Sequence, residues 1–185
     1  LTNANMAKAN LTSASLYGTT LRAADLSFSN LKYANMEAVE LSFANLRAAD
    51  LQGSIMINAF ADKAVFTKAN LSHSSLIEAD FSNSEMQGVN LSGANLTDAN
   101  LTMTNLKNAN FKQANLRGSN IYYTNMSGAN FSGADLRGVH FVGANLNGAD
   151  FTGADLLGAR MSSVLKKYAI FCDARMPNGD RGSCN

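Results

Sequence analysis

The sequence lacks several features that define common classes of protein. Among its 185 residues there are no tryptophans, one proline, two cysteines and two histidines. No run of about 18 apolar residues occurs, and the N-terminus has neither the basic segment nor the apolar core of a secretory signal. We therefore predict no direct membrane insertion by this chain. Because it begins at Leu1 and not at Met, we interpret it as a mature form or an excised domain.

Net charge is almost absent as well. The 15 lysines and arginines are balanced by 14 aspartates and glutamates, which gives a formal net charge of +1. Proteins that recognise DNA, RNA or anionic membranes by bulk charge carry a strong field of one sign. We therefore predict no nucleic-acid partner. With 46% hydrophobic residues, the chain can still bury a sizeable core.

What the sequence has instead is a strict period of five. Every fifth residue from Leu1 to Met161 is Leu, Met, Phe or Ile, except Ala61. The residue two positions before this centre is always Ala, Ser, Thr or Val, and the residue just before it is mostly Asn or Asp. Neither a helix nor a strand collects such a pattern on one face. The period therefore predicts a solenoid whose chain turns every five residues and points each centre inward.

The second residue after the centre marks a corner of this solenoid. It is often Gly in the second half, as at Gly118, Gly133 and Gly153. A type II turn needs a positive φ at its third residue, which Gly adopts without a steric penalty. Asn and Asp side chains can bind nearby backbone groups at such corners. Successive coils are expected to stack like strands of a parallel sheet, about 4.8 Å apart.

The periodicity leaves the number of sides open, because phenylalanines recur at multiples of both fifteen and twenty. The tandem units, such as Ala94-Asn95-Leu96 and Ala154-Asp155-Leu156, closely resemble the A(D/N)LXX units of the pentapeptide repeat family over residues 1 to about 165. That resemblance implies an all-β fold, a right-handed quadrilateral parallel β-helix with four units per coil. On this basis we expect about eight coils in a domain of residues 1–161.

The pattern decays after residue 161, so we assign residues 162–185 to a C-terminal cap and tail. A short helix or compact loop over 162–170 is expected to cover the last coil, since terminal units of repeat proteins are atypical. Because Cys172 and Cys184 are both confined to this tail, we predict a disulfide between them. The tail also resembles those of cyanobacterial and thylakoid-lumen members. We expect an oxidising compartment, the thylakoid lumen or the periplasm, with the cytoplasm as the alternative.

No group of residues indicates catalysis, and we predict no catalytic, cofactor-binding or metal-binding residues. His73 falls at a corner and His140 at an Asn/Asp position, about three coils apart on a four-sided coil. The carboxylates are dispersed, and the two cysteines supply only half of the ligands of a structural zinc. A core filled by large side chains leaves no ligand cavity. The chain is therefore predicted not to be an enzyme.

Our leading hypothesis for function is a structural or interaction module with an unknown protein partner. The family resemblance adds an alternative, since some members mimic DNA and bind type II topoisomerases. Mimicry requires a strongly acidic rod, whereas basic and acidic residues are interspersed here. A third hypothesis is an extramembrane domain of a larger cyanobacterial membrane protein that helps to deposit envelope glycolipids.

One segment departs from the repeat and is our candidate interaction patch. Three outward Asn/Asp positions hold Ile55, Phe60 and Val65, Ile57 adds another apolar residue, and Ala61 is the one small centre. In the simpler interpretation, Phe60 turns inward to fill the volume that Ala61 leaves. In the alternative, Phe60 stays outward and forms a docking patch with its apolar neighbours.

Two further expectations concern the rest of the surface. Phe28, Tyr33 and Phe43 fall at different corners of a four-sided coil, so we do not expect them to form one patch. The first coil has no visible cap. Its apolar rung and unpaired backbone predict end-to-end self-association through the N-terminal coil, or burial by residues outside this chain.

Overall fold

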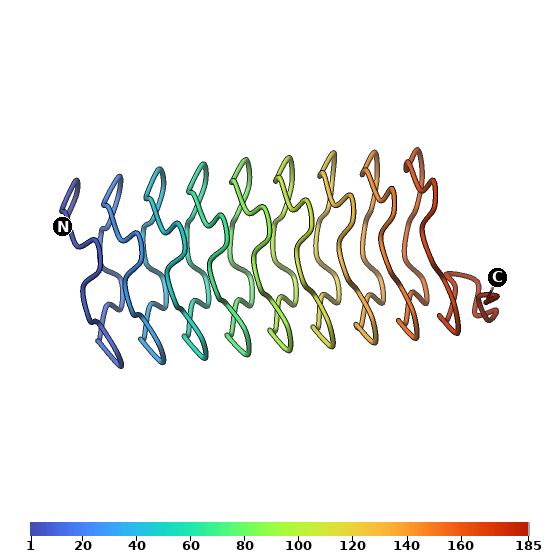
Figure 1. The fold of residues 1–185 in the computed structure, drawn as a ribbon, viewed down its shortest axis with the longest axis horizontal. Helices are drawn as coiled ribbons and strands as arrows, with labels where there is room; N and C mark the ends of the chain where they lie inside the picture. Colours follow the sequence, from blue (N-terminus) through green and yellow to red (C-terminus); the bar gives the residue numbers. More distant parts are fainter. Residues whose placement is uncertain (185) are drawn as a thin grey trace.

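The protein forms a rod of stacked coils with its termini at opposite ends (Figure 1). The computed structural model describes residues 1–184. Parallel bridges join each outward residue to the one twenty positions later, from Asn5 with Asp25 to Asp155 with Arg175. Each coil therefore has four five-residue sides, as the family resemblance implied, and a period of fifteen is excluded. We number the faces by their first outward residues: Asn5 begins face 1, and Asn10, Ser15 and Thr20 begin faces 2, 3 and 4.

The repeating element is shorter than an ordinary strand. Residues 1–184 contain no helix, so none that could cross a membrane, and each outward residue is an isolated bridge and not part of a longer strand. At nearly every corner a backbone N–H donates to the carbonyl three residues earlier, as in Ala4 N to Leu1 O at 3.1 Å. The second corner residue has a positive φ at every turn from Asn3 to Asp173. The period of five is thus a series of tight turns joined by single bridge residues.

Corner side chains lean onto the next coil, where a glycine often makes room for them. A Cβ placed on Gly53 would lie 2.7 Å from two ring carbons of Tyr33, and one on Gly143 would lie 2.7 Å from Tyr123. The glycines at these two corners therefore serve two purposes. They adopt the positive φ of the turn, and they let an aromatic ring from the preceding coil lie flat on the backbone.

The centres fill the interior as four columns. From Leu21 to Leu156 every centre is completely buried, with the small residues beside them. The rings of Phe111, Phe131 and Phe151 stack along face 2 with centroids 4.8 Å apart, and Phe171 extends the stack at 5.0 Å. Phe141 packs edge-on against this stack. Such close packing of apolar side chains is the main stabilising contribution to the rod.

Asparagines outside the core form hydrogen-bonded ladders along the faces. The Asn Oδ1 accepts from the backbone N–H two residues later, as in Ser92 N to Asn90 Oδ1 at 3.2 Å. The Nδ2 of the same side chain donates to the preceding coil, as in Asn90 to Asn70 and Asn110 to Asn90, both at 3.1 Å. Each asparagine within such a ladder therefore fixes its own corner and ties two coils together.

Phe60 points outward, so the interpretation that it fills the space beside Ala61 is wrong. Its ring side chain is 55% exposed. The backbone N–H of Phe60 donates to Val39 O at 2.9 Å and its carbonyl accepts from Leu41 N at 2.6 Å. These bonds hold it in the outward bridge position between Glu40 and Asp80. An inward turn would break this pairing.

Two core phenylalanines compensate for the small centre at Ala61. Phe66 is the next centre along the chain and Phe81 is the centre one coil above Ala61, and both are completely buried. Their rings meet edge to face with centroids 5.4 Å apart. The large rings at these two neighbouring centres fill the volume that the small centre leaves, so no outward side chain has to turn into the core.

The helix or loop expected over 162–170 is also wrong, because the coil continues through this segment. Turns run to Asp173 and bridges to Arg175, past the boundary predicted at residue 161. The N–H groups of Leu165 and Ile170 bind carbonyls of the preceding coil at 3.0 and 2.9 Å. The hydrogen bonds to those carbonyls stabilise this segment although its side-chain pattern is poor. Lys166 can occupy a centre because the last rung is open and its side chain is exposed.

The final residues fold back along one side of the last coil. The backbone N–H of Gly182 donates to Ala174 O at 2.7 Å, and Arg175 forms an antiparallel bridge with Arg181. Cys172 and Cys184 form a disulfide with Cα atoms 4.2 Å apart. The predicted pairing of the two cysteines is therefore present, and it fastens the tail to the last coil.

Candidate interaction surface

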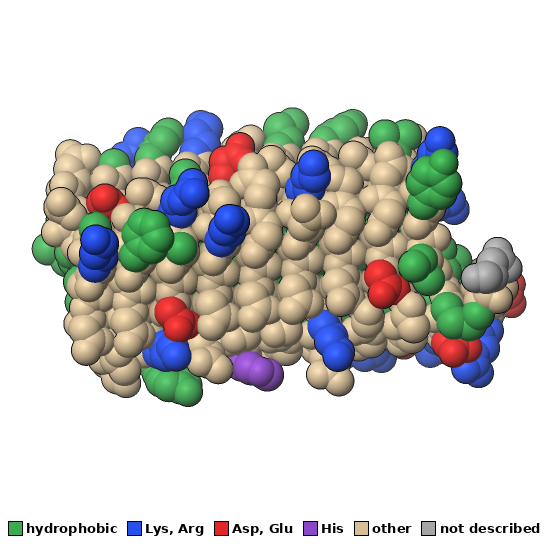
Figure 2. Space-filling model, viewed as in Figure 1, with side chains coloured by type: hydrophobic (Ala, Val, Ile, Leu, Met, Phe, Trp, Pro, Cys, Tyr) green, Lys and Arg blue, Asp and Glu red, His purple; other side chains and the backbone are tan. Residues whose placement is uncertain are grey.

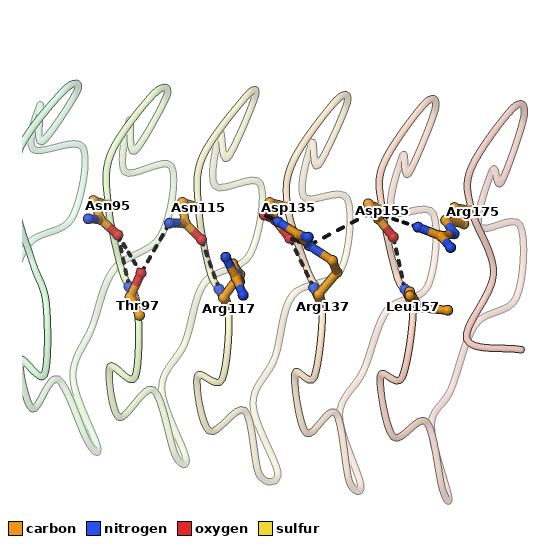
Figure 3. Close-up of polar contacts among 9 residues, drawn as sticks. All are labelled: Asn95, Thr97, Asn115, Arg117, Asp135, Arg137, Asp155, Leu157 and Arg175. Atoms are coloured by element: carbon orange, nitrogen blue, oxygen red, sulfur yellow. Dashed lines mark hydrogen bonds and ion pairs between the residues drawn. The ribbon is translucent and has the colours of Figure 1, made fainter. Parts of the chain in front are cut away.

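Charged residues on face 3 and on the corner after it pair with one another in the last coils. An open hollow of about 440 Å³ lies near Arg117 and Arg137. Arg137 donates through Nε to Asp135 Oδ1 at 2.8 Å and lies 3.8 Å from Asp155, which also pairs with Arg175 at 3.6 Å (Figure 3). The hydrogen bond from Arg137 is the main cause that lowers the pKa of Asp135. The ion pairs of Asp155 with Arg137 and Arg175 tie successive coils together.

The two histidines lie apart, as the sequence predicted. His73 is at the corner after face 2, where its ring lies on Gly93. His140 is on face 4, more than three coils away, where its Nδ1 is 2.9 Å from the hydroxyl of Tyr122. They cannot act on one substrate or one metal ion. Among residues 1–184, the nearest approach to a metal-ligand set is Asp173 with the two disulfide-bonded cysteines, whose sulfurs are already bonded to each other.

Large exposed apolar side chains are concentrated in the first coils, and a second group lies in the last coil. Between residues 61 and 160 the structure exposes only Met103 and Tyr123. The last coil exposes Leu165, Tyr168 and Ile170. The first group is larger and consists of Leu1, Tyr17, Phe28, Tyr33, Phe43, Ile55 and Phe60.

The four residues of the candidate patch do not lie on one flat face. Ile55 is 40% exposed on face 3 and Phe60 is exposed on face 4, with half-buried Ile57 at the corner between them. Val65 is half-buried on face 1, one corner further round the coil. The structure therefore brings Ile55, Ile57 and Phe60 around one edge of the rod and places Val65 beside the next edge.

Phe43 occupies that next edge and joins the two groups. Its ring has the guanidinium of Arg22 at 4.7 Å and the ammonium of Lys63 at 5.4 Å from the centroid. All three lie at the corner between faces 4 and 1, between Phe60 and Val65. The sequence prediction treated Phe43 as an isolated aromatic. In a coil of twenty residues, positions 23, 43 and 63 form one column. This spacing of twenty could have identified the cluster from the sequence.

Basic residues flank face 1 on both of its corners. These basic residues, two phenylalanines at the same corners and Val65 on the face form what we call the face 1 surface. It comprises Lys8, Arg22, Phe28, Phe43, Arg47, Lys63, Val65 and Lys68. One side of the rod is drawn in Figure 2, where basic and hydrophobic side chains gather over the N-terminal half and uncharged polar atoms dominate the middle. Cations and apolar groups thus occur together near the N-terminal end.

The acidic groups on and beside face 1 accept hydrogen bonds from local donors. Glu85, which follows Val65 on face 1, accepts from the side chains of Gln87 and Asn105. The pKa of Asp62 is lowered mainly by a hydrogen bond from Asn83 Nδ2 at 2.7 Å, with a contribution from Lys63. The pKa of Asp25 is lowered mainly by hydrogen bonds from Ser27, whose backbone N–H lies at 3.0 Å. Of the five basic residues on this surface, Lys63 alone makes an ion pair within residues 1–184, at 3.5 Å from Asp62.

Comparisons with known proteins agree with this architecture. The family model described as "Pentapeptide repeats" matches residues 1–27, 21–58, 44–83, 64–102, 74–113, 94–133 and 129–165. A search of curated proteins gives no match.

Solved structures give the same picture. One is HetL, a pentapeptide repeat protein involved in heterocyst differentiation regulation from the cyanobacterium Nostoc sp. strain PCC 7120. It is 28% identical, with 97% of this chain and 92% of that chain covered and a TM-score of 0.64. QnrB1, a plasmid-mediated fluoroquinolone resistance protein, is 17% identical over 89% of this chain and 85% of its own, with a TM-score of 0.55, and this likeness concerns the fold alone. A pentapeptide repeat protein from the thylakoid lumen of Arabidopsis thaliana is 32% identical over 54% of this chain and 66% of its own, with a TM-score of 0.45.

Proposed function

This chain belongs to the pentapeptide-repeat family, and we propose that it is a non-enzymatic scaffold that binds a protein partner through its first coils. We also assign to its four-sided coil the right-handed sense that the family resemblance implies. A continuous core and hydrogen-bonded faces make the backbone a rigid support. Outward side chains on such a support lose little conformational freedom when a partner binds, which favours recognition.

The observation that carries this proposal is the exposure of Phe60. The equivalent outward positions elsewhere on face 4 are mostly polar, as at Asn100 and Asn120. A large ring at this place gives up the hydrogen bonds of an asparagine and exposes apolar surface. Exposed aromatic residues with apolar neighbours and a charged rim are typical of binding hot spots. Ile55 and Ile57 supply the neighbours, and Glu40 and Asp80 supply the rim.

Substitution of Phe60 by Asn tests the proposal. The ring is more exposed than buried, and Asn can bind the backbone N–H of residue 62 as its counterparts do, so the melting temperature should barely change. Capture of the native partner from an extract of the source organism should be lost. Ile170→Asn is the matched control, because it removes another exposed apolar side chain from an outward position in the last coil, at the other end of the rod. Equal capture by wild type and Phe60→Asn would contradict the proposal.

The two alternative functions receive less support. QnrB1 is only 17% identical in sequence, so its similarity to this chain concerns the fold alone. A DNA mimic needs a strongly acidic rod, whereas this chain has a formal net charge of +1 and clusters cations around face 1. No observation on these residues favours a role in glycolipid deposition. We therefore retain the protein-binding scaffold.

We further propose that the protein works in an oxidising compartment, the thylakoid lumen or the periplasm, and not in the cytoplasm. The disulfide between Cys172 and Cys184 supports this. Alkylation of thiols at the moment of lysis, followed by mass spectrometry without reductant, should leave both cysteines unmodified. Alkylated cysteines in protein from its native source would place it in a reducing compartment.

A further inference from the structure

We infer that the partner lays an acidic segment with some apolar side chains along the face 1 surface. This inference rests on the proposed function, and it names the chemistry of the partner. The surface is continuous with the exposed ring of Phe60, because Asp62 and Lys63 form the corner that joins face 4 to face 1. A partner bound at Phe60 therefore meets face 1 directly.

The geometry of face 1 provides two parallel rows of cations. Arg22 and Lys63 lie on the corner before the face, on either side of Phe43. The corner after the face carries Lys8, Arg47 and Lys68 together with Phe28. At the inter-coil spacing these residues extend over roughly 15–20 Å, which an extended peptide of about six residues would cover. The rows thus match the length of a short linear segment.

The charges of these rows are available to a ligand. Lys8, Arg22, Arg47 and Lys68 are exposed and form no ion pair with any residue in the described part of the chain. The carboxylates of Asp25 and Asp62 are occupied by donors from Ser27 and Asn83. With Glu85, which follows Val65 on face 1, three carboxylates stand against the five cations, so the net charge of this surface is positive although the whole chain is nearly neutral. Complementary charge favours an acidic partner and increases its association rate.

The state of the aromatic rings favours a peptide over a nucleic acid. Single-stranded nucleic acids bind by stacking bases on open aromatic faces. Arg22 and Lys63 both lie over the ring of Phe43, so Phe28 is the one aromatic ring of this surface without a cation over it, and a row of stacking platforms is absent from it. Val65 and Phe28 instead offer apolar contacts of the size of an aliphatic side chain. Asp25, in the middle of the face, disfavours a continuous anionic plane such as a lipid surface.

A synthetic peptide allows a direct test. The probe is a fluorescent peptide of about eight residues containing Glu and Leu, and its reference is the same peptide with Gln in place of Glu. Wild type should bind the Glu peptide at least about tenfold more tightly than the Gln peptide, and salt should weaken this binding. The double variant Arg22→Gln, Arg47→Gln should weaken binding of the Glu peptide about tenfold.

The matched control is the double variant Lys112→Gln, Arg117→Gln, which removes two exposed cations from other corners of the rod. It should bind the Glu peptide as wild type does. The inference is overturned by equal loss in both double variants, by equal binding of the two peptides, or by no binding at millimolar peptide. Tighter binding of an oligothymidine or of phosphatidylglycerol vesicles would also overturn it. If Phe60→Asn still abolishes capture of the native partner, then only the acidic chemistry fails and the scaffold function stands.

Discussion

Asparagine and aspartate share the outward positions of the coil but make different hydrogen bonds. Both accept the backbone N–H two residues later. Only asparagine also donates to the preceding coil, so it can continue a ladder, whereas aspartate can only begin one. Asp50 accordingly receives Asn70 Nδ2 at 3.0 Å, and Asp80 receives Asn100 Nδ2 at 3.0 Å. The mixture of the two residues in the repeat is therefore ordered by the ladders.

The middle of a ladder provides the first prediction. Asn90→Asp removes the donor to Asn70 and places two acceptors side by side, so the free energy of unfolding should fall by about 1 kcal/mol. Urea denaturation measures this. Asn35→Asp is the control, because Asn35 accepts from Glu37 N and makes no ladder bond to its coil neighbours Ser15 and Ile55. A similar loss in both variants would show that the ladder donor is not responsible.

The pair of Asp135 and Arg137 predicts a dependence on pH. The pKa of Asp135 is lowered below its usual value of 3.8, mainly by the hydrogen bond from Arg137. The unfolded chain thus binds the proton more readily, so the stabilisation is complete above about pH 4 and is lost as the pH falls through the lower folded pKa. Between about pH 5 and pH 2, Asp135→Asn and Arg137→Gln should each lose less stability than wild type. Identical pH profiles would contradict this assignment.

At the scale of the element, the corner determines which residues can follow one another along the rod. All corners share one backbone conformation, yet the side chain of one coil determines what the next coil can hold. Tyr33 and Tyr123 each lie on a glycine of the following coil. Where a ring lies over the next corner in this way, a glycine is required twenty positions later, a constraint that no single five-residue unit contains. It does not apply to every large corner residue, because Lys63 follows Phe43 and Tyr123 follows Met103 in the same column.

Two glycines with the same backbone conformation test this constraint. Gly143 and Gly148 have φ of 69° and 67°, but only Gly143 has a ring, that of Tyr123, within 4 Å of a would-be Cβ. Gly148→Ala should cost roughly 1 kcal/mol through the backbone alone. Gly143→Ala should cost more, and the excess should vanish when Tyr123→Ala is added. Thermal denaturation of the four proteins gives these differences, and equal costs at the two glycines would refute the constraint.

At the scale of the whole molecule, the two ends of the rod differ. The C-terminal coil is partly paired by the tail, which the disulfide holds in place. At the other end, Leu1 is 61% exposed, and the backbone N–H groups of Asn5 and Asn10 pair with nothing within residues 1–184. An exposed edge of this kind is a template for another chain.

We therefore predict that the chain of residues 1–185 associates end to end through its first coil. Sedimentation velocity should show a mass that rises with concentration. Leu1→Glu with Met6→Glu should abolish this, because two carboxylates would meet their copies across the contact. Leu165→Glu, at the opposite end, is the control. A monomer at all concentrations, or disruption by the control alone, would contradict association through the N-terminal edge.

The sequence by itself determined the features that depend on neighbouring residues. The period of five required a turn at every fifth residue, and the alternation of large apolar, small and Asn/Asp positions assigned each side chain to the inside or the outside. These follow from turn geometry and burial, which act over a few residues. The confinement of Cys172 and Cys184 to the tail likewise predicted their disulfide. The outward departures at Ile55, Phe60 and Val65 were visible as breaks in this local pattern.

Only the tertiary structure decided the features that depend on which residues stack. The bridges between positions twenty apart fixed four sides, where the phenylalanine spacing allowed two solutions. Pairing with Val39 and Leu41 kept Phe60 outward, and pairing with the preceding coil extended the rod to Arg175 despite a degraded pattern. The contacts of Arg22 and Lys63 with Phe43 also arise between coils. Such contacts join residues that are distant along the chain, so their energies appear only when the coil closes.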